Sequence, residues 1–460
     1  MAFNINQYHN FFFIGIAGTG MSALAQYLKG IGKNVSGSDR EFKEENELLI
    51  KNQFQQLGIH CYPQDGSGIY TGIDAVIIST AIEKSNLEYQ KAVELKIPII
   101  KRSELLSAIS KTKRTIAVAG TSGKSTTAAM IFHILQSNNY SPSLITGAGL
   151  IDLQEKKIPG NTWVGKSDWL VIEADESDGS IVNYFPEISV LLNIEKDHKE
   201  FEELIDLFKI FKNNTSDIFI VNYDQALTKK LSQNSYHDFG FSGKPGYTGS
   251  NFKQTGFNIS FFVNSVSFNI PVIGRHNMEN ALAAIAVCSK VGINLKDSAK
   301  SLKNYRGIYR RTQLIGKKNN IYVIDDFAHN PSEVAAAITS CQKIGKRVLA
   351  WFQPHGFGPL RFFHNELSNK IVNTLRKNDI FYISDVYYAG GTVNKNISSE
   401  VVSIAVSEMG KNAEYIPNRQ DFIPVIKNIL KKNDVILLMG ARDPSLSEFS
   451  EFVYFSLINK

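Results

Sequence analysis

Residues 119–127 have the sequence AGTSGKSTT and lie between an expected strand at residues 115–119 and an expected helix. A glycine-rich turn in that place points backbone N–H groups and a helix N-terminus at an anion, and the lysine adds a mobile positive charge. The segment is shorter than the GxxxxGK[ST] pattern, because Val118 stands where that pattern needs glycine. We predict a phosphate loop, in which Ser125 can ligate Mg²⁺. Its candidate nucleotide contacts are Gly120, Thr121, Ser122, Gly123, Lys124, Ser125 and Thr126.

Acidic residues follow another expected strand. Residues 169–178 have the sequence WLVIEADESD, so an apolar strand ends in four acids within six positions. Clusters of this kind are usually solvated loops. Beside a phosphate loop, however, carboxylates at the carboxyl end of a strand are suited to hold the Mg²⁺ of a nucleotide, because a hard cation prefers oxygen ligands. Glu173 is the first candidate ligand, and His198, which follows an expected strand at residues 188–192, could reach the same ions.

A second glycine-rich loop lies near the N-terminus. Residues 15–22 have the sequence GIAGTGMS between an expected strand at residues 11–16 and an expected helix at residues 21–31, and they fit GxGxxG with alanine in the second place. Such a loop cradles a diphosphate, and an acid about twenty residues later can meet a ribose hydroxyl. The pattern fits NAD, FAD or a nucleotide-sugar. The candidate contacts are Gly15, Ala17, Gly18, Thr19, Gly20, Met21, Ser22 and Asp39.

The C-terminal third contains a polar cluster. Residues 325–333 have the sequence DDFAHNPSE, in which Asn330 is suited to cap a helix and Pro331 to begin it. Charges there face the carboxyl edge of a sheet, where α/β proteins bind ligands. Upstream, Arg310 and Arg311 stand at a domain junction, from which a guanidinium can reach a phosphate when domains close. For Arg310 we favour a structural salt bridge.

The elements that position these motifs alternate between short β-branched or aromatic runs and amphipathic stretches, which indicates parallel α/β domains. The chain has 460 residues, of which 43% are hydrophobic, and a formal net charge of +6. We predict three domains at residues 1–110, 111–308 and 309–460, with hairpins at residues 239–271 in the middle one. The further expected strands are at residues 34–37, 75–79, 321–324, 348–351, 380–384 and 435–439, with helices near residues 104–109 and 277–291.

Composition excludes several classes of protein. No window approaches 18 consecutive apolar residues, so a membrane span is not expected. The mild basic excess does not indicate nucleic-acid binding. The early run FFFIGIAG is too short and glycine-rich for a signal peptide, and the three cysteines have no disulfide or zinc spacing. We expect a cytoplasmic protein that acts on small molecules, as a monomer or homodimer.

Taken in order along nearly the whole chain, these motifs resemble those of the Mur ligases of peptidoglycan synthesis. The resemblance also includes residues 274–281, with the sequence GRHNMENA. It is closest to the branch that joins L-alanine to UDP-N-acetylmuramate, and to the related branch that attaches a preformed tripeptide to the same nucleotide.

The resemblance implies a Rossmann-like N-terminal domain for the UDP part, a central ATPase domain with a P-loop-type mixed sheet and a Rossmann-like C-terminal domain for the amine. It implies that ATP converts the muramate carboxylate into an acyl phosphate, which the amine then attacks. By match to the family's motifs, the catalytic residues are Lys124, Glu173, His198 and Arg311. The metal ligands are Ser125, Glu173 and His198. The further ATP contacts are Asn277, Asn280, Arg311 and Asp326, and the amine-site candidates are His329, His355 and Arg361.

Departures from the family pattern leave the amine open. Alanine-adding enzymes have a sequence like FQPHRYTRTR where this chain has FQPHGFGPLR at residues 352–361. Gly356 and Pro359 therefore replace two arginines of the kind that meet a carboxylate, and Arg361 remains. Residues 325–331 have the sequence DDFAHNP, where alanine-adding enzymes have DDYGHHP. The sequence of this chain is nearer to that of the tripeptide-adding branch. We predict L-alanine as the amine, because the first two thirds of the chain resemble that branch best. A tripeptide, or a different acid and amine pair, is the alternative.

Two alternatives come from other classes of protein. A non-hydrolysing regulatory relative is disfavoured because Lys124, Glu173, His198 and Asp326 are all retained. An NAD-dependent dehydrogenase would use the N-terminal loop and Asp39, but it leaves the phosphate loop and its acids unexplained.

Overall fold

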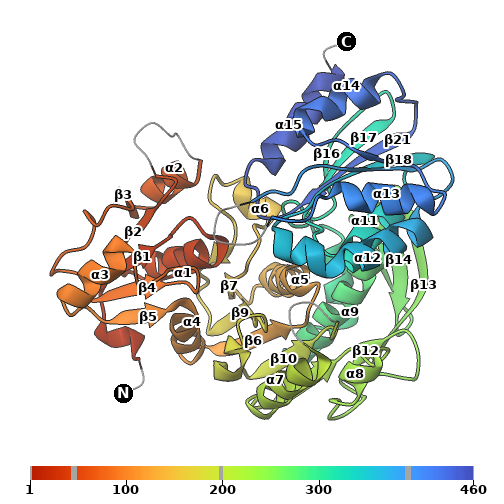
Figure 1. Cartoon of the computed structure of the whole chain (residues 1–460). Helices are drawn as coiled ribbons and strands as arrows, with labels where there is room; N and C mark the ends of the chain where they lie inside the picture. The colour runs from red at the N-terminus through yellow and green to blue at the C-terminus, as the bar shows by residue number, and fades with distance from the viewer. Residues whose placement is uncertain (1–2, 43–48, 196–199, 389–394, 459–460) are drawn as a thin grey trace. The chain divides into compact units, whose positions relative to one another are not determined.

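The computed structural model describes residues 3–42, 49–195, 200–388 and 395–458 of the chain. Over these residues the chain forms two compact units. The first comprises Met1–Asn251, Phe261–Phe268 and Glu279–Ile308, and the second comprises Phe252–Ser260, Asn269–Met278 and Tyr309–Lys460. Both units combine parallel sheets with helices, and the α/β class predicted from the sequence is confirmed (Figure 1).

The N-terminal part of the first unit is a parallel sheet, seen in red and orange in Figure 1. Its spatial order is β3 (His60–Pro63), β2 (Asn34–Asp39), β1 (Asn10–Ile14), β4 (Ala75–Ile78) and β5 (Ile99–Lys101). The helices connecting these strands are α1 (Thr19–Gly30), α2 (Leu49–Gln56) and α3 (Leu87–Glu94). The short helix η1 (Ile5–Gln7) precedes the sheet, and α4 (Arg102–Ser110) follows β5 and leads to the central part.

Alternation along β1 explains why this sheet has helices on both faces. Phe11 and Phe13 belong to a core shared with α1, α2 and α4, whereas Phe12 and Ile14 belong to a second core that includes Ala92 of α3. All four side chains are buried. Successive side chains of a strand point to opposite faces, so a run of apolar residues marks a strand covered on both sides.

The central part of the first unit contains the phosphate loop. Its sheet has the order β11 (Ile218–Val221), β10 (Ile188–Leu191), β6 (Arg114–Ala119), β9 (Trp169–Glu173), β7 (Ser143–Ile145) and β8 (Thr162–Trp163). Neighbours run parallel except for β7 and β8, which pair antiparallel. The helical elements are α5 (Lys124–Ser137), α6 (Ile151–Gln154), η2 (Ser180–Asn183), α7 (Phe201–Asn213), α8 (Ala226–Lys229) and α10 (Leu295–Leu302).

The glycine- and asparagine-rich region after the central sheet forms strands, as predicted. The sheet has the order β12 (Phe239–Gly240), β13 (Tyr247–Thr255), β14 (Asn258–Val263) and β15 (Val266–Ile270). Asn264 and Ser265 turn from β14 to β15 with φ of 44° and 73°, which suits a two-residue hairpin turn. The long helix α9 (Arg275–Lys290) follows.

The second unit is built on another mostly parallel sheet. Its order is β16 (Gln313–Lys318), β17 (Ile321–Asp326), β21 (Asp434–Gly440), β18 (Arg347–Gln353), β19 (Ile380–Ile383) and β20 (Ala413–Tyr415), and β16 pairs antiparallel with β17. One face packs on α11 (Pro331–Cys341), α12 (Phe357–Thr374) and α13 (Glu400–Glu408). The other packs on α14 (Phe422–Lys427) and α15 (Leu446–Ile458), near η3 (Arg419–Asp421).

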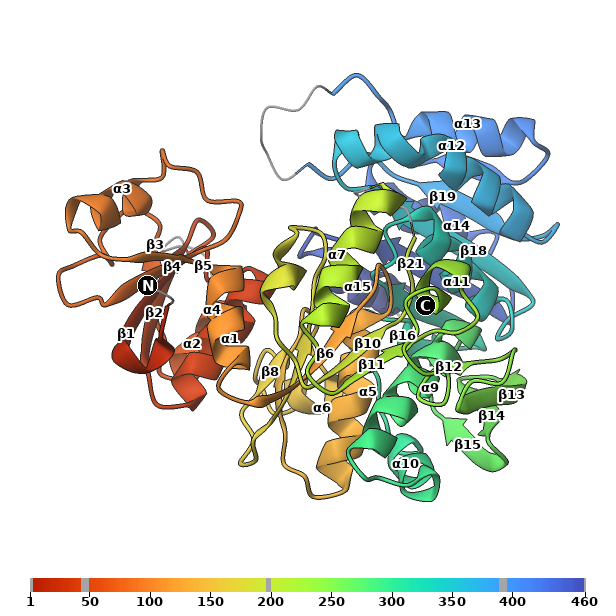
Figure 2. The ribbon, with the colours of Figure 1, turned by 90° about the horizontal axis from the view of Figure 1, so that it is seen from below.

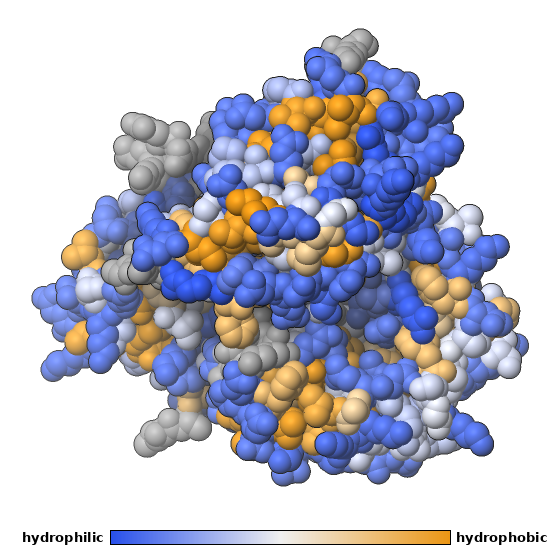
Figure 3. Space-filling model, turned by 45° about the vertical axis from the view of Figure 1, so that its right-hand side comes forward, coloured by the Kyte–Doolittle hydropathy of each residue, from blue (hydrophilic) through white to orange (hydrophobic). Residues whose placement is uncertain are grey.

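The surface in Figure 3 is mostly hydrophilic, with separate apolar patches. Exposed apolar residues include Phe452 and Phe455 of α15, and scattered groups of this kind are ordinary on a folded surface. No helix in the described part of the chain is long and apolar enough to cross a membrane.

Candidate functional site

The predicted phosphate loop connects β6 to α5. Gly120 has φ 135° and Gly123 has φ 84°, values that side chains with a Cβ rarely adopt. Space is limiting as well, because a Cβ on Gly123 would lie 2.5 Å from Oδ1 of Asn280. Glycine at residue 123 therefore lets the loop turn directly into the first turn of α5, where backbone N–H groups have no helical partner and can bind an anion.

Asn193, which follows β10, fixes the shape of this loop. Its Oδ1 accepts hydrogen bonds from Thr121 Oγ1 at 2.9 Å and from Ser122 N at 2.8 Å. Its Nδ2 donates to the Ser122 carbonyl at 3.0 Å. One amide side chain thus satisfies three groups of the loop. The sequence analysis did not select Asn193, although its position just after a strand beside the loop was the available signal.

Lys124 is the first residue of α5 and lies among carboxylates. Its Nζ donates to the Gly120 carbonyl at 2.7 Å and to Glu176 Oε2 at 2.9 Å, and Asp175 Oδ1 is 3.7 Å away. Burial opposes the charge, but the two carboxylates outweigh it and hold the pKa of Lys124 above its ordinary value. The ammonium is therefore a permanent cation, which the phosphates of a nucleotide would share with Glu176.

Glu173, the last residue of β9, is held in place by its neighbours. Its Oε1 accepts a hydrogen bond from Thr146 Oγ1 and one of 2.6 Å from Gly147 N. Ser125 lies beside Lys124 in the first turn of α5. A carboxylate and a hydroxyl are suitable donors for Mg²⁺, which typically takes one or two carboxylates together with water and substrate phosphates. These residues therefore fit a nucleotide-bound Mg²⁺.

The structure describes only part of the predicted set of metal ligands. Among the residues that the structure describes, no group of three or more His, Cys, Asp or Glu side chains could hold a metal ion without further ligands. His198 lies outside the described residues. The ligand set therefore stays a prediction.

Helix α9 carries the two asparagines predicted to contact ATP. Asn280 accepts a hydrogen bond of 3.4 Å from Thr127 Oγ1, so it lies against the phosphate loop. Asn277 Nδ2 donates to the Ile273 carbonyl at 2.7 Å. The structure therefore relates Asn280 to the loop that would hold the phosphates, whereas Asn277 stabilises the start of its own helix.

The N-terminal loop is held by the end of the neighbouring strand β2. The Ser38 carbonyl accepts hydrogen bonds from Gly15 N at 2.8 Å and Ile16 N at 2.9 Å. Asp39 Oδ2 accepts from Ala17 N at 3.0 Å, and burial raises the pKa of this carboxyl. Asp39 was predicted to meet a ribose hydroxyl. In the structure one of its oxygens holds the loop itself.

Behind this loop lies a buried acid that the sequence analysis did not select. Glu88, in the first turn of α3, accepts a hydrogen bond of 2.5 Å from Ser38 Oγ. The side chain is completely buried, and burial raises its pKa to about 7. Because Ser38 also binds the loop through its carbonyl, Glu88 fixes the residue that fixes the loop.

The two arginines at the start of the second unit have different roles. Arg310 is buried; its Nε donates to Asp325 Oδ2 at 2.9 Å and its Nη2 to the Gly440 carbonyl at 2.8 Å. The structural salt bridge predicted for Arg310 is confirmed. Arg311 is more exposed, with Nη1 3.8 Å from Glu333 Oε1. The ring of Phe327 lies within 5.4 Å of both guanidinium carbons.

Several predicted residues of the second unit meet at the carboxyl edge of its sheet. His329 Nδ1 is 3.1 Å from Glu333 Oε2, and the rings of His329 and His355 are 5.5 Å apart. Burial opposes ionisation of Glu333, but His329 and Arg311 outweigh it and hold its pKa well below the usual range. Asn330 caps α11 by accepting from Glu333 N at 3.0 Å, and Pro331 begins the helix, as predicted.

Asp326 ends β17 at the same edge. It accepts hydrogen bonds of 2.6 Å from Thr312 N and 2.7 Å from Ala328 N. Burial raises the pKa of its carboxyl to about 6, although the Arg311 guanidinium favours the charged form. Asp326 therefore holds the backbone on both sides of the Arg311 and His329 cluster.

The segment that lacks the two arginines begins α12. Gly356 precedes the helix with φ 75°, and Arg361 is exposed on its second turn. A cavity of about 300 Å³ lies at this end of the helix. It is lined by Phe357, Asp385, Val386, Lys395, Asn396, Ile397, Ser398 and Ser399.

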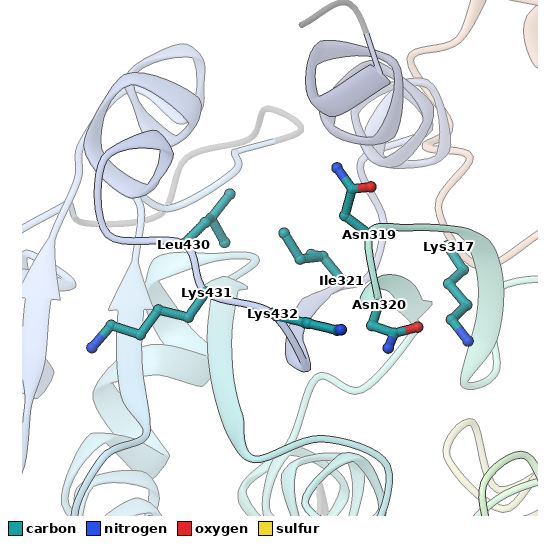
Figure 4. Close-up of a pocket in the computed structure, with 7 residues that line it drawn as sticks. All are labelled: Lys317, Asn319, Asn320, Ile321, Leu430, Lys431 and Lys432. Atoms are coloured by element: carbon teal, nitrogen blue, oxygen red, sulfur yellow. The ribbon is translucent and has the colours of Figure 1, made fainter.

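Another cavity lies away from these motifs, at the amino edge of the same sheet. It has a volume of about 510 Å³ and is lined by Lys317, Asn319, Asn320, Ile321, Leu430, Lys431 and Lys432 (Figure 4). These residues come from the end of β16, the following turn, the start of β17 and the segment before β21. Figure 4 shows the Lys431 side chain directed away from Lys317. Because its lysines do not converge, we assign this cavity no ligand.

Comparison with protein families identifies the class of protein. Residues 10–114 match the Mur ligase family catalytic domain, residues 118–288 match the Mur ligase middle domain, and residues 310–442 match the Mur ligase glutamate ligase domain. The chain belongs to the Mur ligase family, in agreement with the motifs read from the sequence. The predicted domain boundaries at residues 110 and 308 stay predictions.

Individual relatives narrow the comparison. The chain is 33% identical over 449 residues to a UDP-N-acetylmuramate–L-alanine ligase of Syntrophomonas wolfei, with 94% of each chain covered. It is 34% identical over 448 residues to the protein of the same name from Dictyoglomus turgidum, with 93% of each covered. Among solved structures, the UDP-N-acetylmuramate–alanine ligase of Thermotoga maritima has a TM-score of 0.81, 26% identity, and coverage of 98% of this chain and 100% of that one. A murein peptide ligase from Psychrobacter arcticus shares the fold, with a TM-score of 0.68, 20% identity, and coverage of 98% of this chain and 99% of that one.

Proposed function

We propose that this chain is an ATP-dependent ligase that joins the carboxylate of UDP-N-acetylmuramate to the amino group of L-alanine, in the synthesis of peptidoglycan precursors. The observation that carries the proposal is the full-length similarity to ligases of that name, at 33–34% identity over 93–94% of both chains. The geometry supports it, because a lysine-bearing phosphate loop and a second diphosphate-type loop lie in one unit. With its nucleotide substrates the enzyme would act in the cytoplasm.

In the proposed reaction a carboxylate oxygen of the muramate attacks the γ-phosphorus of ATP, and ADP leaves. The amine nitrogen then attacks the carbonyl carbon of the acyl phosphate, phosphate leaves with the C–O bond electrons, and the nitrogen gives up a proton. Lys124 would stabilise the negative charge on the transferred phosphoryl group, and the backbone amides of the loop would hold the phosphates. The hydrogen bond from Lys124 Nζ to the Gly120 carbonyl supports this role, because it keeps the ammonium beside the loop.

Mg²⁺, when bound with ATP, would supply charge neutralisation on the phosphates, held by Ser125, Glu173 and His198. The chain's own residues determine where it can bind. Thr146 and Gly147 fix the Glu173 carboxylate through hydrogen bonds, so that its orientation does not depend on the ion.

The amine is expected in the second unit, where His329 and His355 meet and where α12 begins. Because Gly356 and Pro359 replace arginines, the carboxylate of alanine needs another cation. Arg361 is one candidate, and Lys395, which lines the cavity at the start of α12, is a second. The same replacements favour the tripeptide-adding reaction as the second candidate function, since a longer amine substrate can place its carboxylates elsewhere.

Phosphate release from ATP and Mg²⁺ tests the proposal. UDP-N-acetylmuramate is combined in turn with L-alanine, L-serine, glycine and the tripeptide L-Ala-γ-D-Glu-diamino acid, and the product is identified by mass. Release with alanine, together with the mass of the alanyl amide, is expected. UDP-N-acetylglucosamine is the matched control, because it lacks the carboxylate that must be activated. Release with the tripeptide alone would replace alanine by the recycling substrate, and release with none would refute this acid.

A further inference from the structure

Asn161 lies between the two nucleotide-binding parts of the first unit. It is 4% exposed and precedes β8. Its Nδ2 donates to the Thr19 carbonyl at 2.9 Å and to Ser22 Oγ at 2.8 Å, and its Oδ1 accepts from Gln26 Nε2 at 2.8 Å. Both donor hydrogens of the amide and its oxygen therefore form hydrogen bonds with residues of α1. This helix continues directly from the N-terminal loop.

The contact between α1 and this segment is close. Thr162 Oγ1 donates to the Ala23 carbonyl at 2.8 Å. A Cβ on Gly30 would lie 2.6 Å from Val164 Cγ2, so glycine allows the helix to approach the chain after β8. In Figure 2, α1 and β8 are neighbours, in agreement with the contacts between them. The helix cannot shift at Asn161 without breaking buried hydrogen bonds.

The same residue leads to the ATP site through its backbone. The Asn161 carbonyl accepts a hydrogen bond of 3.0 Å from Thr146 N, next to the antiparallel pairing of β7 with β8. Thr146 Oγ1 in turn donates to Glu173 Oε1. A continuous path therefore runs from Thr19 and Ser22, through Asn161 and Thr146, to the carboxylate predicted to bind Mg²⁺.

We propose that Asn161 is a positioning residue that couples binding of the UDP-linked acid at the N-terminal loop to binding of the Mg²⁺-nucleotide beside Glu173. This inference rests on the proposed function, because it takes UDP-N-acetylmuramate as the ligand of the N-terminal loop. A ligand that orders Thr19 to Ser22 orders Asn161 with them. The amide is fully engaged and buried, so the change is passed to Thr146 and to the Glu173 carboxylate instead of being absorbed.

The coupling is measurable as a ratio of dissociation constants. Calorimetry gives the Kd of Mg²⁺ with a non-hydrolysable ATP analogue, in the absence and in the presence of saturating UDP-N-acetylmuramate. We expect the acid to strengthen analogue binding in the wild-type protein by at least about fivefold. Because the binding of the two ligands is thermodynamically linked, the analogue must strengthen binding of the acid by the same factor.

Three variants test the path. Asn161→Ala breaks its first half, and Thr146→Val breaks its last hydrogen bond while it leaves α1 untouched; both are expected to reduce the ratio to within about twofold of one. Thr162→Val is the matched control, because it removes a buried hydrogen bond from the same interface but leaves Asn161 and Thr146 in place. It is expected to keep the wild-type ratio. Melting temperatures show which variants are folded, and if Asn161→Ala is not, Thr146→Val still decides the test.

A wild-type ratio of one, or a wild-type ratio kept in Thr146→Val, would overturn the inference. Equal loss of coupling in Thr162→Val would also overturn it, because a generally weakened interface would then explain the result. Failure of the proposed function has a different signature, since the wild-type protein would form no alanyl product in the ligation assay.

Discussion

The first unit contains two glycine-rich loops that begin after a strand and end in a helix, and they are held in different ways. The central loop carries Lys124 and is held by the neutral amide of Asn193. The N-terminal loop carries no lysine, and a carboxylate, Asp39, accepts one of its amides. One loop thus has a lysine cation beside it, whereas the other has an acid behind it.

We expect this difference to separate a catalytic role from a binding role. A fixed cation beside the transferred phosphoryl group lowers the energy of the charge that develops during reaction. An acid that accepts hydrogen bonds from a loop orients the backbone of the loop, but it does not stabilise the negative charge that develops during the reaction. We therefore expect the two loops to serve different steps, so that substitutions in them affect different kinetic constants.

The largest effect is expected for Lys124→Ala. Loss of the cation should lower kcat for ligation by about a hundred- to a thousandfold, with a smaller change in the KM of UDP-N-acetylmuramate. Steady-state phosphate release measures both constants, and circular dichroism checks the fold. Lys166→Ala, at an exposed lysine of the same unit, is the control. Turnover like that of the wild type would remove Lys124 from the mechanism.

A smaller effect is expected when the central loop is released but keeps its lysine. Asn193→Ala removes three hydrogen bonds from Thr121 and Ser122. Misplaced phosphates should lower kcat/KM for ATP by on the order of a hundredfold. The matched control is Asn214→Ala, which removes an asparagine that bonds the Val182 carbonyl instead. An unchanged ATP constant would mean that the loop holds its shape without Asn193.

The corresponding change at the N-terminal loop should affect the other substrate. Asp39→Ala removes the acceptor for Ala17 N, and we expect the KM of UDP-N-acetylmuramate to rise about tenfold while kcat changes by less than about twofold. Asp65→Ala, at an exposed acid of the same domain, is the control. A fall in kcat without a change in KM would contradict the division between the loops.

The last prediction concerns stability rather than turnover. Burial raises the pKa of Glu88 to about 7, so the folded protein keeps a proton that the unfolded chain releases near pH 4.5. The stability contributed by this proton is complete below pH 4.5 and is lost as the pH rises through 7, by at most about 3 kcal/mol. Between pH 5 and pH 8, the melting temperature of the wild type should fall relative to that of Glu88→Gln. The control variant Glu94→Gln, on the same helix, should show the same dependence of melting temperature on pH as the wild type. If the curve of Glu88→Gln is also parallel to that of the wild type, Glu88 holds no buried proton.

Much of the fold was predictable because local pattern decides it. The apolar runs at residues 115–119 and 169–172 form β6 and β9. Asn330 caps α11 and Pro331 begins it, as expected. The strand predicted at residues 11–16 ends at Ile14, because Gly15 turns with φ 77°. The antiparallel edge strands β8 and β16 were not predicted, since the direction of an edge strand depends on partners elsewhere in the chain.

The site divides in the same way. Glycines, lysine and acids are recognisable from type and spacing within a few residues. Asn193 and Asn161 are not recognisable in this way, because their partners are distant in the sequence. Ser122 lies 71 residues from Asn193, and Gln26 lies 135 residues from Asn161. A lone asparagine gives no local signal of this kind. The roles of the predicted contacts, His198 included, stay predictions.

The ion pair of Lys124 with Glu176 has a consequence for which form of the nucleotide the enzyme accepts. The Lys124 ammonium pairs with Asp175 and Glu176, which follow β9, and Glu173 is the last residue of that strand. The three carboxylates that interact with Lys124 outnumber its single charge, so they repel the negative charge of a polyphosphate instead of balancing it. We therefore expect the site to bind the metal-complexed nucleotide in preference to the free one. Chelation of Mg²⁺ should then weaken nucleotide binding itself as well as the reaction.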